Sequence, residues 1–129
     1  MNGAAVAEKL RALRAAAPFR ALDEPELQLV AEHARLRAFS AGEVILAAGT
    51  VADALFVEAD GSVFVAGRPA PPVFDAPGLL FGLAATADYV SGPEGFRALV
   101  LAKPHVFTIA RECPEFVVGL RNLLDGGLP

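Results

Sequence analysis

From Arg35 onward the apolar residues recur with a period of two, and this alternation limits the middle of the chain to β-structure. Strand-like runs are expected at residues 35–39, 43–47, 54–59, 62–66, 73–75, 98–102 and 105–110. Asp60-Gly61 predicts a two-residue hairpin turn, and Lys103-Pro104 predicts a bend between the last two strands. Short strands at near-regular spacing are typical of a small antiparallel barrel or jelly roll.

Helical patterns occur only at the two ends. An amphipathic helix is expected over 4–17, ended by Pro18, and a second helix begins at Asp23, where Glu26 completes a capping box. A closing helix is expected over 114–124. The sequence therefore predicts one mainly β domain over 1–129, a double-stranded β-helix or jelly-roll barrel. Its parts are a helical N-terminal segment (4–34), the barrel (35–110) and one C-terminal helix (114–124).

Charge and composition narrow the function classes. The net charge is −4, and residues 38–96 carry one arginine against seven acids, a net of −6. No basic face is visible, so a nucleic-acid partner is not expected. The longest uncharged apolar run, 76–87, is too short and too broken by proline and glycine to cross a membrane. With a single cysteine, Cys113, no internal disulfide can form, and a cytoplasmic location is expected.

Few residues suggest catalysis or metal binding. His33 and His105 are distant in sequence, and a metal site needs a third histidine or carboxylates beside them. No Ser-His-Asp spacing or carboxylate pair stands out, so neither catalytic residues, a metal nor a cofactor is expected. Cys113 precedes a helix-opening proline. It is expected to be structural, with a lowered thiol pKa at the helix start as the alternative.

The least regular stretch is 78–98. Its first half is apolar and nearly uncharged, and Gly82 is followed by Leu83–Ala87, a short run of helix formers. A helix that opens at a glycine presents free backbone N–H groups and the positive end of its dipole. The pattern therefore indicates an anion-binding loop.

Several segments, in chain order, resemble the cyclic-nucleotide-binding domain of catabolite-activator-type regulators and nucleotide-gated proteins. They are Pro18–Leu22, Phe39–Ile45, Gly49-Thr50, Ala54–Val57, Asp60–Val63 and Gly78–Gly82. The resemblance covers roughly residues 18–124. It implies a barrel with a phosphate-binding cassette at 78–98 and makes Gly82, Leu83, Ala84, Ala85, Arg97 and Ala98 the candidate ligand-binding residues.

The chain departs from this family at both charged anchors. Leu83 stands where a glutamate holds the ribose 2′-hydroxyl, and Phe96 stands where an arginine pairs with the cyclic phosphate. Arg97 lies one residue later, which on a strand is the opposite face unless a bulge at 89–93 restores its direction. Each lost charge-assisted hydrogen bond is worth about 1.5–3 kcal/mol. The pocket is therefore expected to be degenerate, with Leu83 filling it as core. The family has two helices after the barrel, and only one is expected here.

These observations favour a stand-alone regulatory or interaction module with impaired or lost cyclic-nucleotide binding. The alternative is a sensor of a cyclic nucleotide or a related small anionic ligand that uses Arg97 and backbone groups of the cassette. A cupin-type barrel enzyme is a remote alternative. The closing helix is apolar on more than one side, through Val117 and Val118, which suggests a protein partner or a homodimer through the terminal helices.

Overall fold

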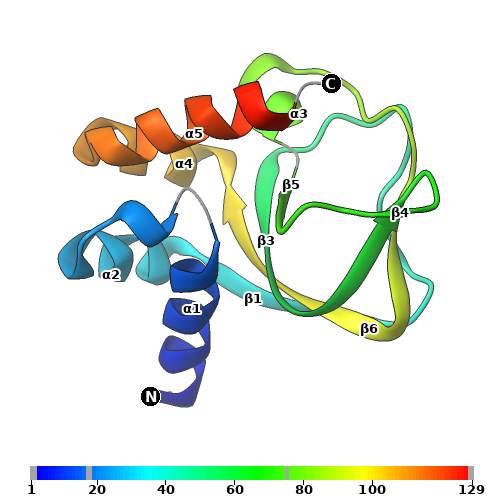
Figure 1. Cartoon of the computed structure of the whole chain (residues 1–129), viewed down its shortest axis with the longest axis horizontal. Helices are drawn as coiled ribbons and strands as arrows, with labels where there is room; N and C mark the ends of the chain where they lie inside the picture. The colour runs from blue at the N-terminus through cyan, green and yellow to red at the C-terminus, as the bar shows by residue number, and fades with distance from the viewer. Residues whose placement is uncertain (1–2, 17–18, 75, 128–129) are drawn as a thin grey trace.

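The protein is built on a six-stranded antiparallel sheet with helices on one side (Figure 1). The computed structural model describes residues 3–16, 19–74 and 76–127, and the side chains of 5–16, 19–74 and 78–121. Its main path runs β1-β6-β3-β4, while β2 pairs with β6 and β5 pairs with β3. The strands are β1 (Arg35–Phe39), β2 (Val44–Leu46), β3 (Ala54–Val65), β4 (Arg68–Pro69), β5 (Val73–Phe74) and β6 (Tyr89–Ala102). The mainly β fold with flanking helices is as predicted.

β3 and β6 are the two long strands, and each is bent by register shifts. The predicted hairpin at Asp60-Gly61 is wrong, because β3 continues through these residues. Gly61 instead lies at an irregularity, with φ +84°, and a side chain there would collide with the carbonyl oxygen of Gly95. A bulge needs the same glycine that a tight turn needs, so the two cannot be told apart from the dipeptide alone.

The N-terminal helices follow the predicted pattern. They are α1 (Gly3–Ala15), a 3₁₀ turn η1 (Phe19–Ala21) and α2 (Glu24–His33). The capping box at Asp23 is confirmed, because the Glu26 amide donates to Asp23 Oδ1 and the Asp23 amide donates to Glu26 Oε1, each at 3.0 Å. Pro18, the expected end of the first helix, lies outside the described residues.

The C-terminal part differs from the prediction. The expected strand at 105–110 is wrong, because Lys103–Glu112 form a helix, α4. This helix begins at the residue that follows the end of β6. Pro104 lies in its first turn, where a missing N–H costs nothing, and Val106 and Ile109 are buried at helical spacing. A second helix, α5 (Pro114–Gly127), follows after Cys113. Two helices therefore follow the sheet, where one was expected. Among the described residues, no helix is long and apolar enough to span a bilayer.

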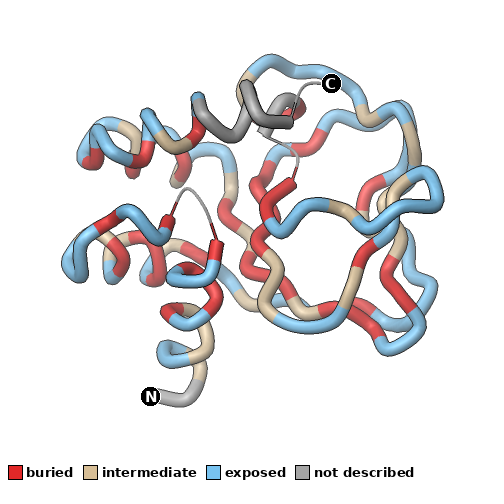
Figure 2. The backbone as a smooth tube through the Cα atoms, viewed as in Figure 1, coloured by how far each residue is buried: buried red, intermediate tan, exposed pale blue. Residues whose placement is uncertain are grey.

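The buried residues, red in Figure 2, belong to helices and strands alike. Their side chains form two clusters on opposite faces of the sheet. One lies between the helices and the sheet and includes Leu99 and Leu101 of β6, together with the paired rings of Phe19 and Phe116. The other lies inside the curl of the sheet and includes Phe96 and Ala98 of the same strand. Alternate residues of β6 therefore serve the two cores, as the pleat of a strand requires.

Candidate functional site

The cassette region has a different geometry from the predicted one. Its helix, α3 (Ala76–Phe81), precedes Gly82, and no helix follows that glycine. Gly82 has φ +67° and donates its N–H to the carbonyl of Gly78, as a residue at a helix C-terminus does. The predicted helix over Leu83–Ala87 is therefore wrong. The helix end that meets this loop carries carbonyl groups, which repel an anion.

The side chains of the loop also lie differently. Leu83 is 56% exposed and Phe81 is 64% exposed, so the expectation that Leu83 fills the pocket as core is wrong. The Ala85 N–H donates to the Thr50 carbonyl at 2.9 Å, and the Ala85 side chain packs against the inner cluster. Ala84 is exposed. Of the cassette residues singled out from the sequence, only Ala85 and Ala98 contact the barrel interior.

Aromatic rings occupy the inside of the curled sheet, which we call the barrel interior or lumen. We call these rings the lumen cluster. Phe74 is its centre, with ring centroids 5.1 Å from Phe56, 4.8 Å from Tyr89 and 6.2 Å from Phe96. Phe39 stacks on Phe96 at 6.0 Å. The first two pairs are nearly parallel, with interplanar angles of 9° and 11°. Rings packed in this way gain both buried area and ring–ring attraction. Leu83 was therefore not needed to fill the interior.

Phe96 and Ala98 point into the interior, with exposed fractions of 3% and 0%. Phe96 is directly opposite Phe39 in the register of β1 and β6, so their side chains share a face. The upstream irregularity anticipated at 89–93 exists, as a register shift between Ser91 and Phe96. It leaves Phe96, and not Arg97, on the inner face.

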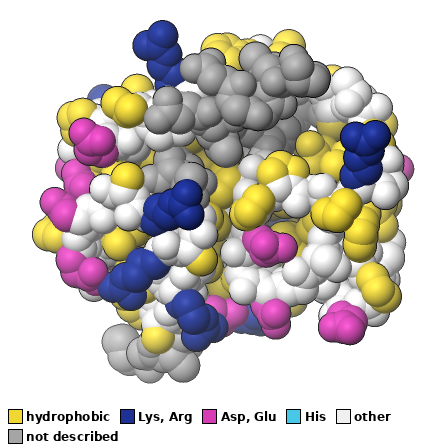
Figure 3. Space-filling view, viewed as in Figure 1, with side chains coloured by type: hydrophobic (Ala, Val, Ile, Leu, Met, Phe, Trp, Pro, Cys, Tyr) yellow, Lys and Arg dark blue, Asp and Glu magenta, His cyan; other side chains and the backbone are white. Residues whose placement is uncertain are grey.

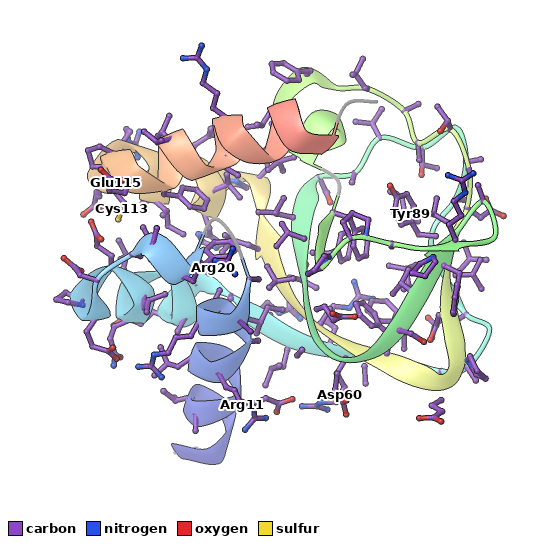
Figure 4. The ribbon with its side chains drawn as sticks, viewed as in Figure 1. Arg11, Arg20, Asp60, Tyr89, Cys113 and Glu115 are labelled. Carbon is purple, nitrogen blue, oxygen red and sulfur yellow. The ribbon has the colours of Figure 1, made fainter. Side chains whose placement is uncertain are left out.

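Arg97 lies on the helical face of the sheet and is paired with α1. Its Nε and Nη2 donate to the two carboxylate oxygens of Glu8, each at 2.8 Å. This bidentate pair lowers the pKa of Glu8 and raises that of Arg97, chiefly through the hydrogen bonds. Asp60 is opposite Arg97 in the register and lies beside α1 in Figure 4, and its charge also raises the Arg97 pKa. The Arg97 side chain is therefore not directed into the barrel interior.

Ser91 is the one buried polar residue among the described side chains, and its Oγ has no hydrogen-bond partner there. It lies opposite Val63, a residue of the inner cluster, so its hydroxyl is on the lumen face. An unpaired buried hydroxyl costs stability. The lumen thus holds one orphaned polar atom beside a group of rings.

The remaining candidates concern metal and thiol chemistry. The fold brings His33 and His105 together, with ring centroids 4.7 Å apart. Within the described residues, no group of three histidine, cysteine or carboxylate side chains could hold a metal. Cys113 is buried, and burial together with nearby carboxylates raises the pKa of its thiol. A structural role for Cys113 is therefore favoured over the alternative of an activated thiol.

No protein-family model matches the chain, and no curated protein matches it in sequence. Solved structures do match it. A cyclic-nucleotide-binding domain from Methylobacillus flagellatus superposes with a TM-score of 0.76 at 16% identity, over 94% of this chain and 76% of that one. The catabolite activator protein of Thermus thermophilus superposes with a TM-score of 0.73 at 23% identity, over 83% of this chain. The chain has the fold of a cyclic-nucleotide-binding domain.

A third similar structure is the regulatory domain of Toxoplasma gondii PKA, solved with cAMP. Its TM-score is 0.70 at 19% identity, over 84% of this chain. The chain spans 45% of the length of that protein and 55% of the length of the Thermus protein. The family that the sequence resembles has two helices after its barrel. In this chain α4 and α5 follow the sheet in the same order. The sequence did not predict α4, because the apolar residues of 105–110 were interpreted as alternating with the period of a strand.

Proposed function

We propose that the chain is a regulatory or interaction module of the cyclic-nucleotide-binding fold whose barrel interior does not bind a cyclic nucleotide. The observation that carries this proposal is the position of Phe96. Its ring packs between those of Phe39 and Phe74, at the place where the resemblance calls for an arginine. The only cation next to it in sequence, Arg97, is turned to the opposite face and paired with Glu8.

The energetics support the same conclusion. Moving one buried phenylalanine into water costs about 1.5–3 kcal/mol, and a nucleotide in this interior has to displace several rings. A phosphate there also loses its hydration without meeting a cation. Among the described residues, Ser91 Oγ is the one buried side-chain polar atom without a partner, and a hydroxyl cannot replace a guanidinium.

Ligand-induced thermal stabilisation tests the proposal. A ligand present at 100 times its Kd adds about 2.7 kcal/mol to the stability of the folded state, which shifts the melting temperature by several degrees. We expect no shift of the melting temperature with millimolar cyclic AMP or cyclic GMP. A saturable shift would overturn the proposal.

The alternative, a sensor that uses Arg97, makes a different prediction for one variant. If a nucleotide shifts the melting temperature of the wild-type chain but not that of Arg97→Ala, the alternative function as a sensor is supported. Arg68→Ala is the matched control, because Arg68 is an exposed arginine at the other end of the sheet.

The module is proposed to act through its terminal helices. Val117 and Val118 of α5 are 46% and 51% exposed, and Val6 of α1 is 40% exposed. On the face drawn in Figure 3, acidic and basic side chains are interspersed with apolar ones. Light scattering after gel filtration tests for a homodimer, which the double variant Val117→Ser/Val118→Ser is expected to disrupt if these residues form the contact.

A further inference from the structure

An open groove of about 800 Å³ lies beside the first turn of α4, outside the lumen cluster. Its walls come from three stretches of the chain: the α2–β1 junction, the start of β3, and the β6–α4 junction. Val100 and Ala102 form part of its floor, on the same strand face as Phe96 and Ala98. The groove therefore continues the inner face of the sheet beyond the rings. No histidine is visible on the face drawn in Figure 3, whereas this groove is lined by two.

The groove gathers positive charge in a chain that is acidic overall. Arg35, Arg37 and Lys103 line it, against one carboxylate, Asp53. Among the described side chains, no carboxylate lies within 4.0 Å of any of these three cations, because the ion pairs found there join Arg14 to Glu24 and Arg97 to Glu8. The Arg37 guanidinium lies over the Phe39 ring, 4.8 Å from its centroid, and the Lys103 ammonium lies near the Phe107 ring. None of the three cations is neutralised by a carboxylate, so their positive charge is available to a ligand.

Two imidazoles add hydrogen-bonding groups to the same wall. His33 and His105 both line the groove, with ring centroids 4.7 Å apart. The Nδ1 of His33 lies 3.0 Å from the carbonyl oxygen of Leu29. Because a carbonyl only accepts, this Nδ1 carries the proton, and Nε2 is left to face other partners. α4 also begins here, and its dipole favours an anion in the groove. No side chain caps its first turn, in which the Lys103 N–H donates to the Asp53 carbonyl at 2.8 Å and Pro104 has no N–H.

The remaining walls are apolar. Phe107 is 43% exposed in the groove, and its ring lies 5.9 Å from the Lys103 ammonium. Pro104 and Val100 add aliphatic surface. A volume of about 800 Å³ is within the range of small-molecule sites, roughly 300–1,000 Å³. Three cations in one groove are too few and too local for a nucleic-acid stripe.

We propose that this groove binds a small molecule that carries phosphate or carboxylate groups on an apolar or aromatic body. Arg35, Arg37 and Lys103 bind the anionic groups, while Phe107 and Val100 contact the body. None of the rings of the lumen cluster lines the groove, so this proposal does not depend on the proposed loss of cyclic-nucleotide binding. A bound ligand bridges β1 and the start of α4, and it would thereby fix the position of α4 on the sheet.

The test is an NMR titration of the ¹⁵N-labelled full chain with phenyl phosphate, with benzyl alcohol as the neutral probe. Saturable shifts confined to amides around Arg35 and Lys103–Phe107 are expected with phenyl phosphate and not with benzyl alcohol. Shifts scattered over the surface, or the same response to both probes, would overturn the proposal.

Variants sharpen the test. Arg35→Gln/Lys103→Gln is expected to weaken phenyl phosphate binding at least about tenfold, since two charge-assisted contacts are lost. Arg20→Gln/Arg68→Gln removes the same charge from exposed positions outside the groove and is expected to change the affinity less than about twofold. Equal losses in the two variants would contradict a specific site. If the groove variant is unfolded by circular dichroism, the salt dependence of wild-type binding replaces it. An affinity that does not fall with added salt would then reject the proposal.

A parallel titration with cyclic AMP separates this inference from the proposed function. Shifts at the amides of Phe39, Phe74 and Phe96 contradict the filled lumen and leave the groove proposal standing. Shifts confined to the groove support the groove proposal and leave the lumen account intact.

Discussion

Arg97 of β6 and Glu8 of α1 are joined by two parallel hydrogen bonds of 2.8 Å. The pair attaches the first helix to the sheet and directs the guanidinium away from the barrel interior. The only cation of the 78–98 stretch therefore has a structural partner 89 residues away. The resemblance implies an arginine that pairs with a cyclic phosphate. In this chain Arg97 pairs with Glu8 instead.

The Arg97–Glu8 pair predicts a pH-dependent loss of stability in Arg97→Ala. The pKa of Glu8 in the folded state is below its ordinary value of 4.5, so the carboxylate stabilises the fold above that pH. This contribution disappears as the pH falls through the lowered pKa. We expect Arg97→Ala to lower the melting temperature at pH 7, with a smaller difference from wild type at about pH 3. Arg68→Ala is the control, and an equal difference at both pH values would contradict the role of the pair.

The raised pKa of Glu58 predicts the opposite pH dependence of stability. Its pKa is raised above 4.5, mainly because burial disfavours the charged form and also because Asp60 is near. The charged carboxylate therefore destabilises the fold at neutral pH. Glu58→Gln is expected to raise the urea midpoint at pH 7 and to give no gain below pH 4.5, where the acid is protonated in both states. Glu94→Gln, at an exposed position, is the control. A loss of stability in Glu58→Gln at pH 7 would show that the carboxylate has a favourable partner.

Ser91 offers a test of the orphaned hydroxyl in the lumen. Leaving a buried polar group without a partner costs about 1–3 kcal/mol. Ser91→Ala is therefore expected to increase the free energy of unfolding, by about 1 kcal/mol, when measured by urea denaturation. Ser40→Ala, at an exposed position, serves as the control and should change little. A decrease of similar size in Ser91→Ala would show that the hydroxyl is paired.

The packing of the lumen cluster predicts a contrast between two phenylalanines. Phe96→Ala removes a buried ring and is expected to cost about 3–5 kcal/mol of unfolding free energy. Phe81→Ala removes a ring that is 64% exposed and is expected to cost less than about 0.5 kcal/mol. Similar losses at the two positions would contradict the assignment of Phe96 to the barrel core.

The sequence predicted those parts of the fold that depend on local signals. Asp23 and Glu26 form their capping box because the spacing alone allows it. The opposite faces of Phe96 and Arg97 follow from the pleat of any strand. The hairpin predicted at Asp60-Gly61 was wrong because a bulge uses the same residues as a turn. The strand predicted at 105–110 was wrong because the spacing of Val106 and Ile109 also fits a helix.

Which side chains fill the lumen and which line the groove could be determined only from the tertiary structure. The lumen is filled from β1, β3, β5 and β6, and no local pattern showed that Phe74 would lie among Phe56, Tyr89 and Phe96. The basic groove was missed because residues 38–96 are acidic, whereas Arg35 and Lys103 come from the segments on either side. Their proximity results from the pairing of β1 with β6.

Calorimetric titration of the wild-type chain with cyclic AMP tests most directly whether the barrel interior is closed to a nucleotide. The filled lumen predicts heats equal to those of dilution at micromolar protein. A one-site isotherm with a micromolar Kd that persists in Arg35→Gln/Lys103→Gln would contradict it.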